Sequence, residues 1–168
     1  TSSNLSAALN PTITKLTESL AVTITNSDYT VSELKNIAAS LDTDAKIKLN
    51  NRGTALAGSV SDTFNALSKT LQIESGSSTK HTGSITLSDG DDDTVSAEEI
   101  ITINEKSSGS ITVTNNVKIN GTVANILSAL DAIDTKPDPN NIKVNVIGTY
   151  TPANITSIQT RTNGQISF

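Results

Sequence analysis

The stretch 22–49, VTITNSDYTVSELKNIAASLDTDAKIKL, sets the pattern on which the rest of the chain is built. It opens with an alternating apolar tripeptide and closes with another, Ile47-Lys48-Leu49. Between them Leu34, Ile37 and Leu41 recur at helical spacing behind a capping residue, Thr30 or Ser32. Alternation of apolar and polar residues predicts short strands, so the stretch predicts a strand, a helix and a second strand in that order.

The same pattern returns further along the chain. Thr94 lies seven residues before Ile101, and Thr151 lies seven residues before Ile158, as Thr30 lies seven before Ile37. The full period is 57 to 64 residues, and its length differences fall in polar loops. Self-similarity at a fixed period is typical of repeat architectures, so we interpret the chain as an array of repeats.

The repeats divide the chain into four parts. We read 1–168 as a single repeat array, with a partial repeat 1–27, repeats 28–91 and 92–148, and a partial repeat 149–168. Each unit of an array buries its apolar face against its neighbours. The partial repeats therefore predict further repeats on one or both sides, or contacts with other subunits.

Further helix signals fix the fold class. Thr122 precedes apolar residues at helical spacing that end before Pro137, and Pro152 follows the candidate cap Thr151. The chain then reads as a βα unit repeated about six times, and its class as α/β, with short βα repeats stacked as a solenoid-like or layered array. The alternative is an all-β sandwich, in which Ile101-Thr102-Ile103 would be a strand.

Composition removes several classes of function. Aromatic residues make up 2% and Trp, Met and Cys are missing, so the core must come from Ile, Leu, Val and Ala, and disulfides, thiolate metal sites and cysteine nucleophiles are excluded. A net charge of -5 argues against nucleic acid as a partner. Because no apolar run approaches the roughly 18 residues of a membrane span, we expect no membrane insertion.

One acidic run could bind calcium, because it concentrates the carboxylate oxygens that this cation prefers. It fails as an EF-hand from Asp89, since Thr94 holds the glycine position and Ile100 the twelfth. The alternative is a solvated acidic turn that favours the N-terminus of the following helix by about 0.3–1 kcal/mol. The candidate ligands are Asp89, Asp91, Asp92, Asp93 and Glu99.

Signatures of catalysis are missing from the sequence. His81 is the single histidine and lies in a polar loop without neighbours for a metal site or a triad, so we expect a solvated side chain. Tyr29 and Tyr150 hold matching positions, where we expect packed turn residues. With no phosphate loop, serine elbow or HExxH, the sequence predicts a protein that is not an enzyme.

Two segments, YTVSELKNI at 29–37 and GTVANILSALDAI at 121–133, resemble repeats of very large secreted surface proteins of cyanobacteria and proteobacteria. Those proteins are S-layer-like, or adhesins that often carry haemolysin-type calcium-binding tails. The resemblance implies an extracellular, cell-surface protein with a structural or adhesive role. The Gly- and Asp-rich nonapeptides of such tails do not occur here.

Two functions follow as expectations. The first is a non-catalytic extracellular structural protein that assembles with copies of itself into a surface layer, sheath or fibre, through exposed strands or repeat ends. The alternative is an adhesin or phage-fibre module that binds a glycan or a host protein. The scarcity of aromatic residues favours the first, because binding hot spots are rich in Trp and Tyr.

Overall fold

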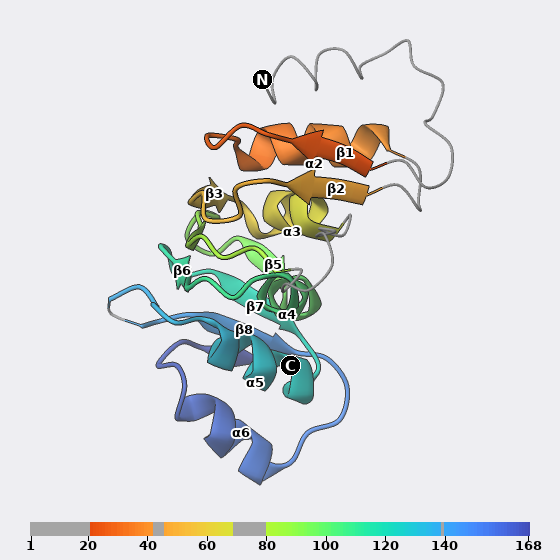
Figure 1. The fold of residues 1–168 in the computed structure, drawn as a ribbon. Helices are drawn as coiled ribbons and strands as arrows, with labels where there is room; N and C mark the ends of the chain where they lie inside the picture. The colour runs from red at the N-terminus through yellow and green to blue at the C-terminus, as the bar shows by residue number, and fades with distance from the viewer. Residues whose placement is uncertain (1–20, 42–45, 69–79, 139) are drawn as a thin grey trace.

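The computed structural model describes residues 21–41, 46–68, 80–138 and 140–168, and there strands and helices follow one another along the chain (Figure 1). The predicted α/β class is confirmed, and the all-β alternative is wrong. The predicted partial repeat 1–27 lies mostly outside the described residues. The elements are β1 (Ala21–Ile24), α2 (Val31–Ser40), β2 (Lys46–Leu49), β3 (Leu56–Gly58), α3 (Val60–Ser68), β4 (Ile85–Leu87), β5 (Thr94–Ser96), α4 (Ala97–Lys106), β6 (Ile111–Val113), β7 (Lys118–Gly121), α5 (Val123–Ala132), β8 (Lys143–Val146), α6 (Pro152–Gln159) and β9 (Ile166–Ser167).

The strands pair in parallel in every sheet of the described chain. The strand orders are β1-β2, β3-β4-β6 and β5-β7-β8-β9. Thr94 lies opposite Lys118, which in turn lies opposite Lys143, so paired residues are 24 and 25 positions apart in the sequence. Parallel strands need a crossover connection of a dozen or more residues, and here a helix provides it.

The helices pack against one another in chain order, from α2 through α3, α4 and α5 to α6, so that the colours of Figure 1 run in sequence from one end to the other. Three helices bury the same positions, one, four and seven residues after the N-cap. These residues are Val31, Leu34 and Ile37 in α2, Ala97, Ile100 and Ile103 in α4, and Val123, Ile126 and Ala129 in α5. Each of these three helices therefore contributes one apolar stripe to a shared core.

Capping residues decide where the helices begin. The N-cap of α2 is Thr30, whose side chain accepts from the Glu33 N–H, while the Glu33 carboxylate accepts from the Thr30 N–H, which forms a capping box. Thr122 and Thr151 cap α5 and α6, as predicted. In the second copy of the pattern the cap is Ser96 and not Thr94, which lies in β5. Ile101-Thr102-Ile103 is inside α4, so it is not the strand of the sandwich alternative.

The two tyrosines have different surroundings. Tyr29 is 1% exposed, and its hydroxyl donates to the Asn51 carbonyl at 2.6 Å, so the prediction of a packed turn residue is confirmed for Tyr29. Tyr150 is 48% exposed and stacks on Phe168, so the same prediction is wrong for Tyr150.

Three glycines lie where the backbones of successive units meet. A Cβ atom on Gly109 would lie 1.9 Å from the carbonyl oxygen of Gly83, and a Cβ on Gly83 would lie 2.2 Å from that of Thr54. A Cβ on Gly164 would lie 2.0 Å from the carbonyl oxygen of Ile142. No side chain fits at such distances, so glycine is required at these positions for the turns to stack.

We expect Gly109→Ala to destabilise the fold by about 1–3 kcal/mol, because the added methyl group must push β6 away from β4 or distort both turns. Gly53→Ala is the matched control, since the nearest atoms to its Cβ would lie at 3.5 and 3.8 Å, which is ordinary contact. Urea unfolding followed by circular dichroism gives both values. Equal losses in the two variants would contradict close stacking at Gly109.

Candidate functional site

The acidic run lies in the turn between β4 and β5. The Asp89 Oδ2 atom accepts a hydrogen bond of 2.8 Å from the backbone N–H of Val60, the first residue of α3. Asp89 therefore caps the helix of the preceding unit, where the unpaired N–H groups and the helix dipole favour a carboxylate. The Asp93 Oδ2 atom accepts from the Gly90 N–H at 2.7 Å and closes the turn.

Asp91 and Asp92 have partners in later units. The Asp91 Oδ1 atom accepts from the Asn116 N–H at 2.8 Å. Asp92 has a left-handed backbone, with φ of 67°, and forms an ion pair with Lys143. The hydrogen bond and charge of Lys143, with a smaller contribution from Lys118, hold the pKa of Asp92 below its usual range. These two carboxylates therefore connect the turn between β4 and β5 to the segment before β7 and to β8.

Glu99 lies in the first turn of α4, and its N–H donates to the Ser96 Oγ atom at 3.4 Å. Partial burial raises the pKa of Glu99, and the negative charge of Asp89 raises it further. The two carboxylates are thus close enough to interact. Within the described ranges, however, no three His, Asp or Glu side chains are grouped so as to hold a metal ion. Calcium binding by Asp89, Asp91, Asp92, Asp93 and Glu99 stays a prediction.

Asp91 also begins a row of side chains at the turns. The Asn116 N–H donates to Asp91, and the Asn141 N–H donates to the Asn116 Oδ1 atom at 2.9 Å. Each bond joins residues 25 positions apart. The equal spacing of Asp91, Asn116 and Asn141 can be found in the sequence. An alignment on the longer period of 57 to 64 residues does not reveal it.

A second row runs along the last sheet. The Asn145 Nδ2 atom donates to the Asn120 Oδ1 atom at 2.7 Å, and the Ser167 hydroxyl donates to the Asn145 Oδ1 atom at 3.0 Å. These side chains project from β7, β8 and β9, where Asn120 lies opposite Asn145 and Asn145 opposite Ser167. A shift of one residue in either strand would turn the side chains to opposite faces and break the row, so the row favours this register.

A third set of contacts joins successive helices. It comprises the ion pair of Lys35 Nζ with Asp62 Oδ1 at 2.8 Å, the hydrogen bond from Asn125 Nδ2 to Glu98 Oε1 at 3.0 Å, and the ion pair of Arg161 Nε with Asp131 Oδ1 at 2.6 Å. The hydrogen bond from Arg161 lowers the pKa of Asp131, while the same bond raises that of the guanidinium. Such exposed pairs contribute little stability each, but all three connect one unit to the next.

The prediction that His81 is a solvated loop residue is wrong, because its side chain is fully buried. The loop is held between units: the His81 N–H donates to the Lys106 carbonyl at 2.9 Å, and the His81 carbonyl accepts from the Ser108 N–H at 2.7 Å. A parallel bridge pairs His81 with Ser107. The loop composition suggested exposure, but pairing with the following unit covers the ring.

Among the described residues, neither nitrogen of the buried His81 imidazole has a partner in hydrogen-bonding geometry, although the backbone of Thr54 lies near the ring. Burial lowers the pKa of His81 below its ordinary value of 6.5, and the charge of Arg52 acts in the same direction. The nearby backbone of Thr54 favours the charged ring and offsets these effects only in part.

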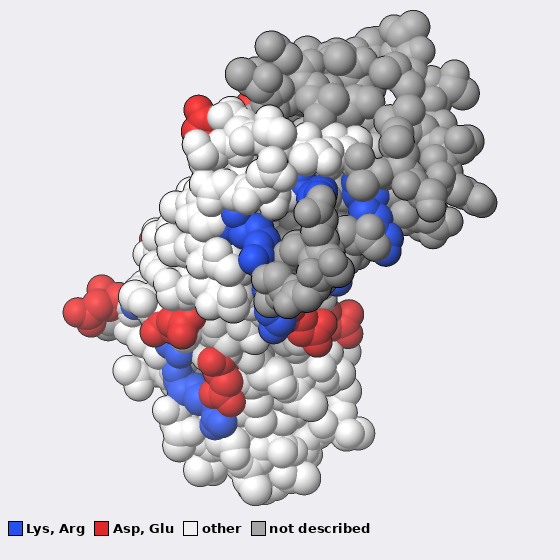
Figure 2. Space-filling model, in the orientation of Figure 1, with Lys and Arg blue, Asp and Glu red and all other residues white. Residues whose placement is uncertain are grey.

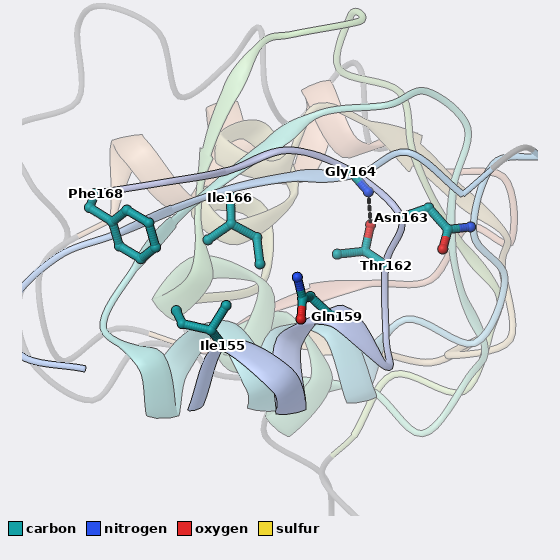
Figure 3. Close-up of a pocket in the computed structure, with 7 residues that line it drawn as sticks. All are labelled: Ile155, Gln159, Thr162, Asn163, Gly164, Ile166 and Phe168. Carbon is teal, nitrogen blue, oxygen red and sulfur yellow. Dashed lines mark hydrogen bonds between the residues drawn. The ribbon is translucent and has the colours of Figure 1, made fainter. Parts of the chain in front are cut away.

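A hollow of about 520 Å³ opens at the end of the molecule formed by α6 and β9, and Figure 3 shows the side chains of both elements around it. Its lining is mixed, with amide and hydroxyl groups beside apolar ones. The lining residues are Ile155, Gln159, Thr162, Asn163, Gly164, Ile166 and Phe168. In the described chain the large apolar side chains that are strongly exposed are Ile147 at 51%, Tyr150 at 48% and Phe168 at 63%, and of these Phe168 lines the hollow and stacks on Tyr150.

Comparison with known proteins gives no match to a protein-family model, to a curated protein or to a solved structure. None of the helices in the described ranges combines the length and the hydropathy that crossing a bilayer would demand. Function must therefore be argued from the geometry of the chain.

We expect Asp89→Ala to lower the free energy of unfolding by about 1 kcal/mol, because the Val60 N–H then loses its acceptor at the start of α3. Asp138→Ala is the matched control, since Asp138 is an exposed carboxylate in a loop and the same charge is removed. Chemical denaturation at neutral pH measures both. A loss no larger for Asp89→Ala than for Asp138→Ala would argue against the cap.

We also expect the stability of the chain to fall as the pH drops below about 6.5. Above that pH the ring is neutral in both states, so His81 contributes no pH dependence. Below it the unfolded chain binds a proton that the folded chain, with its lowered pKa, does not bind, so the free energy of unfolding decreases.

His81→Leu should flatten the stability curve between about pH 6.5 and pH 5, above the range in which most carboxylates titrate. The readout is the urea midpoint across this interval. The chain has one histidine, so the comparison isolates this group. Parallel curves for the wild type and the variant would mean that His81 is accessible to protons in the folded state.

Proposed function

We propose that this chain is a solenoid-like stack of βα units that acts as a non-catalytic structural module and assembles with copies of itself outside the cell. The observation that carries this proposal is the use of polar side chains to join successive units. Asp91, Asn116 and Asn141 form one row at spacings of 25 residues, and Asn120, Asn145 and Ser167 form another. These are the contacts of a scaffold, in which each unit is positioned by its neighbours.

The carboxylates of the acidic run also make contacts that hold the structure together. Asp89 caps α3, Asp93 closes its own turn, and Asp92 pairs with Lys143. A general acid or base needs a cleft that brings it to a substrate, and these carboxylates are held by backbone groups and by a lysine instead. These contacts of the three carboxylates support a structural role over a catalytic one.

Composition and resemblance support the extracellular part of the proposal. The chain is acidic and free of cysteine, and its repeats resemble those of very large secreted bacterial surface proteins. Each parallel sheet also has an outermost strand on either side, and such an edge strand offers unpaired backbone N–H and C=O groups to another chain. A surface layer, a sheath or a fibre would use such edges as contacts between copies.

One observation favours a second function, that of an adhesive module. Tyr150 and Phe168 stack at the surface with ring centroids 4.3 Å apart, and both are strongly exposed. Aromatic side chains of this kind are enriched in binding hot spots and stack on sugars. A glycan or host protein could therefore bind at the end that carries this pair.

Negative-stain electron microscopy tests the structural proposal. We expect the purified chain to form filaments or sheets as its concentration is raised. Parallel samples with millimolar calcium and with a chelator test the calcium prediction, because a site at Asp89–Asp93 would make assembly respond to the ion. Barium serves as a control for a charge effect that does not depend on ion size.

Single particles under every condition would contradict self-assembly. Retention of those particles on a glycan array or on host cells would then favour the adhesive module. Loss of that retention in Tyr150→Ala, with retention preserved in Tyr29→Phe, would place the binding at the exposed aromatic pair. The control keeps the buried ring of Tyr29 and removes only its hydroxyl group.

A further inference from the structure

We infer that the loop 80–83 is an acid-sensitive latch, which protonation of His81 releases from the turns 50–54 and 106–110 on either side of it. The strands and helices stay folded when the latch opens, and the loop returns to its place at neutral pH. The inference concerns the chain itself, so it does not depend on the proposed assembly.

The loop is held in place by backbone hydrogen bonds to both turns. The Thr82 N–H donates to the Arg52 carbonyl of the preceding turn at 2.9 Å. On the other side the His81 N–H donates to the Lys106 carbonyl at 2.9 Å, and the His81 carbonyl accepts from the Ser108 N–H at 2.7 Å. The loop contains a single β-bridge and no helix or strand, so few hydrogen bonds need to break for it to open.

This arrangement covers the imidazole of His81. The side chain is fully buried, and neither ring nitrogen has a partner in hydrogen-bonding geometry among the described residues. A buried polar group without a partner has lost its hydrogen bonds to water, and a buried charge without a partner costs still more free energy. The closed loop therefore holds the neutral ring at a cost and disfavours the charged ring strongly.

Two other turns place a hydroxyl group where this loop has the imidazole. Ser107, which pairs with His81 in a parallel bridge, accepts from the Gly109 N–H at 3.0 Å and donates to the His81 carbonyl at 3.3 Å. In the turn before β9, Thr162 accepts from the Gly164 N–H at 3.0 Å and donates to a carbonyl before β8 at 2.6 Å. Both hydroxyl groups are buried and bonded, so a side chain that does not titrate can satisfy a turn of this kind.

The charged residues around the ring are positive. The three turns contain Arg52, Lys80 and Lys106 and no Asp or Glu. Burial lowers the pKa of His81 most, the charge of Arg52 lowers it further, and no carboxylate in the described chain opposes them. The Thr54 backbone does favour the charged ring, but more weakly than burial disfavours it. Figure 2 shows Lys and Arg side chains gathered across the middle of one face of the molecule. A proton on the closed ring would add to this positive charge.

Opening removes these penalties from the charged ring. In the open loop the ring is in water and binds a proton near its ordinary pKa of about 6.5, which the closed ring does not. The state that binds the proton therefore gains population as the pH falls, by up to about tenfold for each pH unit below 6.5. Above that pH the ring is neutral in both states, and opening does not depend on pH.

The strand that follows the loop is held independently of it. β4 pairs with β3 and β6, and the side chains of Ile85 and Leu87 in β4 are fully buried. Releasing the loop breaks none of these contacts, so it requires less free energy than unfolding the chain. Acid therefore opens the loop before it unfolds the protein.

Hydrogen exchange of the native wild type, followed by NMR at low urea concentrations, tests the inference. After division by the intrinsic exchange rates, we expect the open fraction at the Thr82, Gly83 and Ser108 amides to rise by up to about tenfold from pH 7.5 to pH 5.5. A local opening exposes little surface, so urea should hardly affect it. The Lys143 amide, bonded to the Val117 carbonyl, is the control and should exchange faster as urea is added.

His81→Ser is the matched variant, because it introduces the hydroxyl group found at Ser107 and Thr162 and removes the group that titrates. We expect the open fraction of its loop to be the same at pH 7.5 and pH 5.5. Circular dichroism establishes whether the variant folds, and the wild-type measurement decides the inference if it does not.

Three results would overturn the latch. The first is an open fraction in the wild type that does not change with pH. The second is a urea dependence of the loop amides equal to that of the Lys143 amide, since the loop would then open only when the whole chain unfolds. The third is the same pH dependence in a folded His81→Ser variant as in the wild type.

Discussion

Direct contact between the backbones of successive units is the constraint on which the rest of this structure depends. A Cβ atom on Gly109 would lie 1.9 Å from the carbonyl oxygen of Gly83, so the turns that precede β4 and β6 stack with no side chain between them. The parallel ladder between β4 and β6 begins directly after these turns, where the Ile85 N–H donates to the Ser110 carbonyl at 2.8 Å. A larger residue at either glycine would separate the units and weaken the ladder that begins there.

Polar side chains make contacts between successive βα segments of the chain. Asp89 caps the helix of the preceding unit, Asp91 accepts a hydrogen bond from the following one, and Asp92 pairs with a lysine two strands away in its sheet. Each contact is small in energy, but together they specify which residue lies opposite which. An acidic run that suggests a metal site is thus used here to hold turns and helices in register.

Helix α6 differs from α5 in how far its apolar side chains are covered. An internal helix such as α5 covers its apolar stripe with the neighbouring units, while α6 leaves Ile155 and the hollow beside it open. The two tyrosines show the same contrast, since Tyr29 is buried and Tyr150 lies at the surface.

The sequence by itself determined the local elements: the α/β class, the strands such as Ile85-Thr86-Leu87, and the helix starts at Thr30, Thr122 and Thr151. These follow from alternation, helical spacing and capping, which act within a few residues. Only the tertiary structure decided that Ile85 pairs with Ile111, that Asp89 caps α3 and that His81 is buried. Each of these depends on a partner about 25 to 30 positions away, and no local pattern specifies which unit that partner belongs to, because the loops between units differ in length.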